Sequence, residues 1–149
     1  MSERSAAEKA EYLSKRRARV LPFLAILLIA QQGSFFSDQP GADRPVDHFK
    51  IAAWLILSVV ILMALLTGGS WLQPKRVREL LNDEATQAHR AQAFRAAFIA
   101  SMLGCVFLYF LTMFTHVEAR EAIHIILTVG LSAALLSFGI LERRALRNE

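Results

Sequence analysis

The residues best suited to chemistry in this sequence are Glu121 and His124, which lie three positions apart. On a helix this spacing places both side chains on one face. His124 is the one titratable residue clearly inside an apolar run, and ionisable groups at membrane depth are candidates for function. Histidine can sense protons because its ordinary pKa lies near neutrality. A glutamate followed three residues later by histidine is also half of a carboxylate metal site.

A structural role for this pair is the simpler interpretation, and we favour it. His124 lies less than one turn beyond Glu121, hence near the membrane interface, where a hydrogen bond to Glu121 or to a neighbouring helix would satisfy it. A di-metal bundle needs two such motifs facing inward, and this sequence has one. It also lacks a nucleophile elbow, a phosphate-binding loop and a zinc-protease motif. We therefore expect no metal, no cofactor and no enzymatic activity.

Other polar residues are predicted on the same outer side. Gln31 and Gln32 lie in the outer third of the first apolar run, and His116 lies in the turn before Glu121. The glutamines could bind a polar ligand, although a hydrogen bond between helices is the interpretation that we favour. The candidate signal-sensing residues are Gln31, Gln32, His116, Glu121 and His124.

Four apolar runs must position these residues. The chain is 54% apolar, whereas a soluble domain is usually about 45–50% apolar. A bilayer crossing takes about 20 residues, so four crossings leave no room for a separate soluble domain. We predict an all-α integral membrane protein, a four-transmembrane-helix bundle that forms one domain over residues 1–149. The predicted crossings are residues 20–36, 51–72, 96–115 and 122–141.

The first two predicted crossings differ in how well they suit a bilayer. Residues 20–36 form the weakest crossing, with Pro22 in the first turn, where a missing N–H costs little. Residues 51–72 carry no charge, and Trp54 and Trp71 near the two ends suit an aromatic belt at each interface.

The segment 73–95 is predicted to be a cytoplasmic loop with a helical extension. Asn82 or Asp83 could cap a helix that continues without a break into the third crossing. Arg76, Arg78 and Arg90, with the apolar Leu80 and Leu81, could dock a soluble partner. We favour a positively charged loop resting on anionic lipid, an interpretation that does not exclude docking.

Lysine and arginine positions predict the orientation. Of the 17 basic residues, six precede the first crossing, five lie in residues 73–95, and three follow the fourth crossing. Basic residues favour the cytoplasmic side, and four crossings place all three segments there. We therefore predict that both termini are cytoplasmic. The net charge of +4 and the pI of about 9.7 follow from this topology, and we expect no direct contact with nucleic acid.

Small residues on the last two crossings predict close packing. Ala93, Ala97, Ser101 and Cys105 recur every four residues, and Gly130 precedes Ala134 by four. Small side chains let membrane helices approach closely. The short turn between the two crossings makes them antiparallel neighbours, while a homodimer through one stripe is the alternative. The expected packing residues are Ser101, Gly104, Cys105, Gly130 and Ala134.

The second half of the chain resembles a known group of proteins. The stretches LLNDEATQAHRAQAFRAAF and EAREAIHIILTVGLSAALLSFGILERRALRNE resemble small four-helix membrane proteins of alphaproteobacteria, which accompany short helix-turn-helix regulators of the XRE type. The resemblance implies a bacterial inner membrane and a regulator as cytoplasmic partner. It transfers no catalytic residue, and residues 1–50 do not contribute to it.

These observations predict a non-enzymatic membrane sensor, or a membrane-anchoring or inhibitory subunit, that binds a cytoplasmic transcriptional regulator. The alternative is an accessory subunit of a larger membrane complex or a small-solute transporter. Small drug exporters have four short helices and a deep acidic residue, and none of these four runs contains an internal Asp or Glu.

Overall fold

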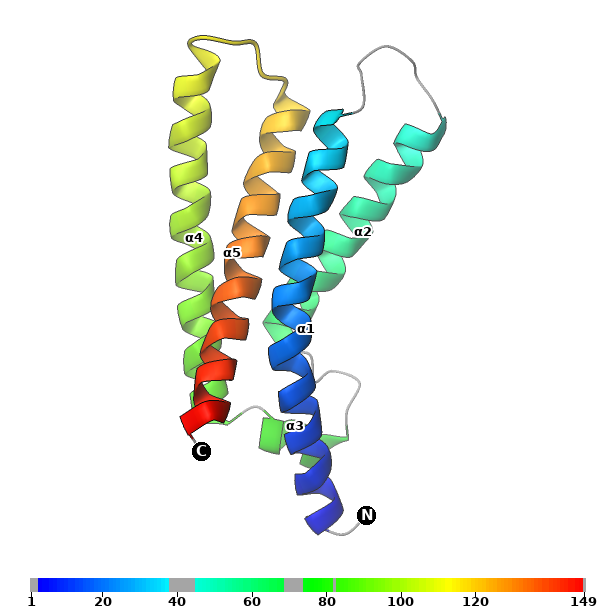
Figure 1. Cartoon of the computed structure of the whole chain (residues 1–149), viewed down its shortest axis with the longest axis vertical. Helices are drawn as coiled ribbons and strands as arrows, with labels where there is room; N and C mark the ends of the chain where they lie inside the picture. The colour runs from blue at the N-terminus through cyan, green and yellow to red at the C-terminus, as the bar shows by residue number, and fades with distance from the viewer. Residues whose placement is uncertain (1–2, 38–44, 69–73, 82, 149) are drawn as a thin grey trace.

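The computed structural model describes residues 3–37, 45–68, 74–81 and 83–148, and these residues are helical except at short connections. Four long helices run along the molecule, and a short one lies across one end (Figure 1). The all-helical prediction is confirmed for this part of the chain. The helices are α1 (Glu3–Ser37), α2 (Pro45–Thr67), α3 (Lys75–Leu81), α4 (Glu84–Thr112) and α5 (Ala119–Asn148).

Within the described residues, three of these helices are long and apolar enough to cross a membrane. The candidate spans are Phe49–Thr67 in α2, Glu84–Thr112 in α4 and Ala119–Arg147 in α5. This finding indicates a membrane protein. The helix α1 is not among these spans, and its apolar run 20–36 ends in residues whose side chains lie outside the described part of the structure. It contains the run that the sequence predicts to be the weakest.

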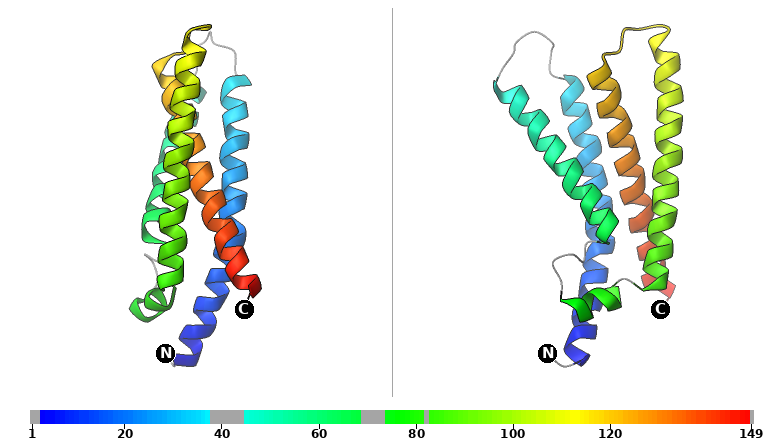
Figure 2. Two further views of the ribbon diagram at one scale, coloured as in Figure 1. Left: turned by 90° about the vertical axis from the view of Figure 1, so that its left-hand side faces the viewer. Right: turned by 180° about the vertical axis from the view of Figure 1, so that it is seen from behind.

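The helix α1 differs from prediction in its continuity. It runs unbroken from Glu3 through Arg19 into the apolar part, so Pro22 lies in the helix interior and not in a first turn. A proline there cannot donate a hydrogen bond to the carbonyl group of Ala18, and interior prolines commonly kink helices. Figure 2 shows the polar first part of α1 inclined to the part that follows.

The boundaries of α2 also differ from the predicted 51–72. The helix begins at Pro45, and proline is favoured in the first turn because its N–H is not needed there. It ends at Thr67, before Gly68 at φ 66°, a left-handed conformation that suits glycine. Trp71 lies outside the described residues, so the aromatic pair of the prediction is untested.

The segment 73–95 is mostly helical and is not a plain loop. It contains α3 and the first three turns of α4. The predicted cap is confirmed at Asp83, whose Oδ1 accepts a hydrogen bond from the backbone N–H of Thr86 at 2.8 Å. Asn82 lies outside the described residues. The helix α4 therefore starts at Glu84, well before the apolar run at 96.

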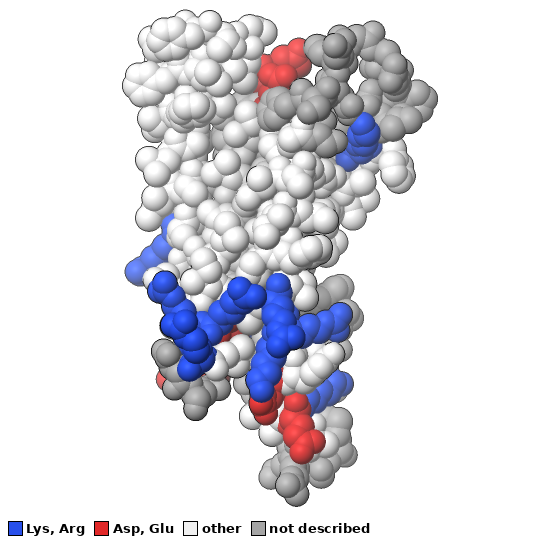
Figure 3. Space-filling model, in the orientation of Figure 1, with Lys and Arg blue, Asp and Glu red and all other residues white. Residues whose placement is uncertain are grey.

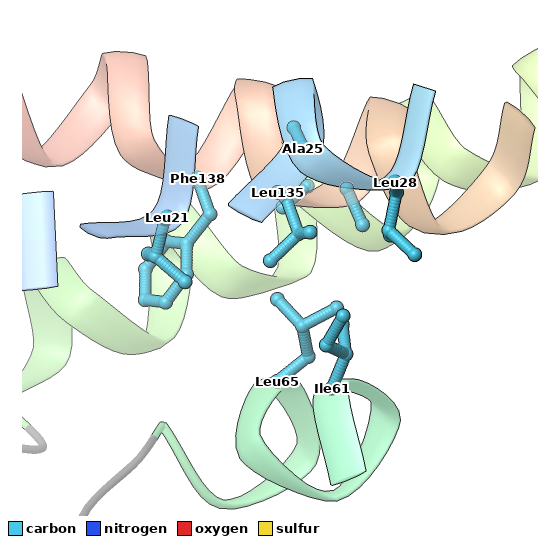
Figure 4. Close-up of a cluster of buried hydrophobic side chains, with 9 residues drawn as sticks. Leu21, Ala25, Leu28, Ile61, Leu65, Leu135 and Phe138 are labelled. Atoms are coloured by element: carbon cyan, nitrogen blue, oxygen red, sulfur yellow. The ribbon is translucent and has the colours of Figure 1, made fainter. Parts of the chain in front are cut away.

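Apolar side chains from α1, α2 and α5, with Ala93 of α4, form the main core (Figure 4). Leu28 of α1, Leu65 of α2, and Leu135 and Phe138 of α5 are almost fully buried there. A second cluster attaches α3 to the polar part of α1. In contrast, α4 exposes large apolar side chains such as Phe98, Leu103 and Phe107, as expected of a helix that faces lipid on one side.

Small residues bring α4 and α5 together, as their spacing predicts. A Cβ atom added at Gly130 would overlap the hydroxyl group of Ser101, and Ala93 and Ala134 are buried. Val129 lies 4.0 Å from the position of a Cβ at Gly104, and Cys105 is half-buried. The stripe is therefore used for packing within the chain, and a homodimer stays an untested prediction.

A second close approach joins α1 and α5. A Cβ atom at Gly139 would lie 2.7 Å from both Cδ and Cγ of Pro22, and 3.4 Å from Cβ of Leu21. The α5 backbone thus lies directly against the proline ring.

We expect Gly139→Ala to destabilise the protein by about 1–3 kcal/mol, because a rigid ring cannot yield to the added methyl group. Gly33→Ala is the matched control, since a Cβ there has nothing within 4 Å. Unfolding of the purified protein in detergent, followed by circular dichroism, measures both. Equal midpoints for the two variants would contradict the close approach.

Candidate functional site

His124 is the centre of a contact among three helices that are distant in sequence. Its side chain is buried, with the residue 5% exposed. Its Nδ1 lies 2.7 Å from Oε1 of Gln32 on α1, and because an amide oxygen only accepts, Nδ1 donates. The indole of Trp54 from α2 stacks on the imidazole with ring centroids 3.9 Å apart and planes at 23°. We call Gln32, Trp54 and His124 the His124 cluster.

The other predicted sensing residues are not part of this cluster. Oε2 of Glu121 accepts a hydrogen bond from the backbone N–H of Glu118 at 3.2 Å, at the start of α5. His116 is exposed in the connection between α4 and α5, and Gln31 is half-buried. The bond to a neighbouring helix, expected as one alternative for His124, is the one to Gln32.

Trp54 is a site residue that sequence reasoning missed. Its position near a helix end predicts a lipid interface, but the residue is buried against His124. The prediction is wrong because the rotation of α2 about its axis turns the face that carries Trp54 toward α5. Local sequence carries no signal for that rotation.

Polar side chains continue from the His124 cluster along α5 and α2. Thr128 and Ser132 follow His124 at intervals of four residues, and Ser58 follows Trp54 by four. Thr128, Ser132 and Ser58 are each more than nine-tenths buried. We call these three residues the polar seam. Among the described residues, five buried atoms here have no hydrogen-bond partner: Gln32 Nε2, Trp54 Nε1, Ser58 Oγ, Thr128 Oγ1 and Ser132 Oγ.

A buried ion pair lies near the other end of α5. Glu142 is 4% exposed, and Nη2 of Arg17 on α1 donates to its Oε2 at 2.7 Å. The hydroxyl groups of Thr86 and Ser14 donate to the same carboxylate at 3.3 and 3.5 Å. Nδ1 of His89 lies 3.5 Å from Oε1 of Glu142. We call these five residues the Glu142 cluster.

Two arginines connect this cluster to the end of α2. Nη1 of Arg17 donates to the carbonyl group of Gly68 at 3.1 Å, and Nη1 of Arg90 donates to that of Leu66 at 3.0 Å. The last carbonyl groups of a helix lack partners within it and attract positive charge. Arg17 also lies over the ring of Phe138, 5.1 Å from its centroid. Nη2 of Arg17 also donates to the hydroxyl group of Thr86 at 3.3 Å. One guanidinium therefore contacts α5, α4 and the end of α2.

The residues predicted to dock a partner do not form one surface. Leu81 packs against Val77 and Ala10, because positions 77 and 81 share the face of α3 that meets α1. Arg90 holds the end of α2, and the side chain of Arg76 lies outside the described part of the structure. Arg78 and Leu80 are exposed.

Exposed basic side chains gather around the end of the molecule where α1 begins and α5 ends (Figure 3). The middle of the face in this view carries almost no charge. We call this the basic band, and its exposed members are Lys15, Arg16, Arg19, Lys75, Arg78, Arg95, Arg143, Arg144 and Arg147. Within the described residues, no group of three His, Cys, Asp or Glu side chains could hold a metal ion.

We expect Glu142→Gln and Arg17→Met each to destabilise the protein by about 3–5 kcal/mol, because each leaves a buried group without its charged partner. The double variant should lose much less than the two singles added together. Lys15→Ala, which breaks an exposed pair with Glu11, is the control and should change nothing measurable. Detergent unfolding midpoints test this; additive losses would show that Arg17 and Glu142 act independently.

Comparison of the chain with family models, curated proteins and solved structures finds no match.

Proposed function

We propose that this protein is a non-enzymatic membrane sensor that holds a transcriptional regulator at the cytoplasmic face of a bacterial inner membrane. One observation carries the proposal: the same two helices, α1 and α5, are joined by buried polar contacts at both ends. Gln32 meets His124 at one end, and Arg17 meets Glu142 at the other. Because α5 continues without a break from His124 to Glu142, a change at the first contact alters how α1 lies on α5 at the second.

We propose that α1 crosses the membrane in addition to α2, α4 and α5. The chain then has four crossings, and both termini are cytoplasmic. Leu21, Ala25 and Leu28 of α1 pack on Leu135 and Phe138 of α5. If α5 crosses the bilayer, this part of α1 lies at membrane depth beside it. The start of α1 and the end of α5 lie at the same end of the molecule (Figure 1), within the basic band, which favours the cytoplasm.

The helix α1 is the moving part in this proposal. Its apolar run is the shortest of the four, and Pro22 interrupts its backbone hydrogen bonds. It keeps its place through specific contacts with α5, and a ligand that changes those contacts shifts the balance between two arrangements.

The helix α3 would pass this change to the partner. It packs on the polar part of α1 through Val77 and Leu81, so a shift of α1 carries α3 with it. Arg78 and Leu80 on its outer side, together with the basic band, suit a protein with an acidic and partly apolar surface. The basic band also suits anionic lipid, which would keep this end at the membrane.

Cysteine labelling tests the topology. In a Cys105→Ser background, Glu8, His116 and Arg147 are replaced by cysteine one at a time. Intact cells are then treated with a membrane-impermeant maleimide. We expect His116→Cys to react in intact cells, and Glu8→Cys and Arg147→Cys to react only after permeabilisation. A three-crossing topology would place positions 8 and 147 on opposite sides.

Purification from the native host after mild crosslinking tests the partner. We expect a small helix-turn-helix protein to co-purify, and charge reversal at Lys75 and Arg78 to reduce its yield at least ten-fold. Arg120→Glu, an exposed charge at the other end, is the matched control and should retain the partner. Co-purification of a large membrane complex that both variants retain would instead support an accessory subunit and contradict this proposal.

A further inference from the structure

The two polar stripes of the His124 cluster and the polar seam face one interface. The helices α2 and α5 run in the same direction (Figures 1 and 2), and Trp54 stacks on His124. Ser58 and Thr128 each follow one of these residues by four positions, which is about one helical turn. Further along, Ile61 and Leu65 of α2 lie in the same core as Leu135 and Phe138 of α5.

The hydroxyl groups of the seam are not bonded as serine and threonine usually are in helices. Such side chains commonly bond a carbonyl group one turn back. Thr67 does so with Met63, and Thr112 with Tyr109, both at 2.7 Å. The hydroxyls of Thr128 and Ser132 have no partner among the described residues, although both side chains are more deeply buried.

The unpaired groups are costly in the folded protein. A buried polar atom without a hydrogen bond destabilises the folded state, and native proteins contain few such atoms. Five of them belong to the His124 cluster and the polar seam, on α1, α2 and α5. A molecule that hydrogen-bonds to them would recover this free energy on binding.

The donor chemistry defines that molecule. The indole Nε1 of Trp54 and the amide Nε2 of Gln32 only donate, and the three hydroxyls can donate. Residues 51–67 and 122–140 contain no Asp, Glu, Lys or Arg, so an ion beside the polar seam would have no counter-charge within these two segments. The flat stack of Trp54 and His124 suits a ring. The complementary ligand is uncharged, flat, soluble in lipid and rich in carbonyl oxygens.

We infer that the His124 cluster and the polar seam bind a membrane-soluble quinone, whose ring carbonyl oxygens accept hydrogen bonds from these side chains. This inference rests on the proposed sensor function and names the chemical class of its signal. Bound quinone would bridge α2, α5 and α1 at the contact between Gln32 and His124.

Fluorescence of the full-length protein in nanodiscs tests the inference. Trp71→Phe leaves Trp54 as the only tryptophan, because the chain has two. Titration with decylubiquinone should quench Trp54 to saturation. Thr128→Val and Ser58→Ala in this background should each weaken apparent binding roughly ten-fold, as expected for one lost hydrogen bond. Thr112→Val, which changes an exposed hydroxyl on α4, is the matched control and should bind normally.

Thermal unfolding separates a binding role from a structural one. Without quinone, Thr128→Val should be at least as stable as the parent, because it removes an unpaired hydroxyl. With quinone, the parent should gain stability and Thr128→Val should gain much less. Linear quenching that is equal in all variants would overturn the inference, as would a loss of stability in Thr128→Val without quinone. Because no partner is present, failure here leaves the test of regulator capture unaffected.

Discussion

The ion pair between Arg17 and Glu142 is the interaction on which the arrangement of the helices depends. It joins α1 to α5, while Thr86 adds α4 and the carbonyl group of Gly68 adds the end of α2. Removing two charges from water costs several kcal/mol per ion and is offset only when good geometry and further hydrogen bonds accompany the pair. Since lipid gives helices no hydrophobic reason to associate, this network adds a specific polar contact among α1, α4, α5 and the end of α2 to the close packing of small residues.

The two polar contacts between α1 and α5 differ in how many of their hydrogen-bonding groups have a partner. At Glu142, the carboxylate accepts hydrogen bonds from Ser14 and Arg17 of α1 and from Thr86 of α4, and two buried nitrogen atoms there, Arg17 Nε and His89 Nδ1, have no hydrogen-bond partner among the described residues. At His124, several donors have no acceptor among the described residues. Between them, the contact of Gly139 with Pro22 holds the two backbones close together. On our proposal, this asymmetry makes one end of the helix pair able to respond to a ligand and the other able to transmit the response.

Much of the fold was predictable because it depends on local spacing. Apolar runs indicate helices, Asp83 caps the helix that follows it, and small residues near Ser101 and Gly130 bring α4 against α5. The boundaries were less predictable. Helix propensity continued through the polar residues before Val20, which placed Pro22 in a helix interior, and Gly68 ended α2 earlier than its apolar run suggested.

The sequence by itself determined helical structure, membrane character and the candidacy of Gln32 and His124. Only the tertiary structure decided that Arg17 pairs with Glu142 across 125 positions, that Leu81 turns inward, and that Trp54 covers His124 instead of facing an interface. The physical reason is that contacts between helices depend on the rotation and register of each helix relative to the others. Composition and periodicity specify which residues share a face, but not which face meets which neighbour.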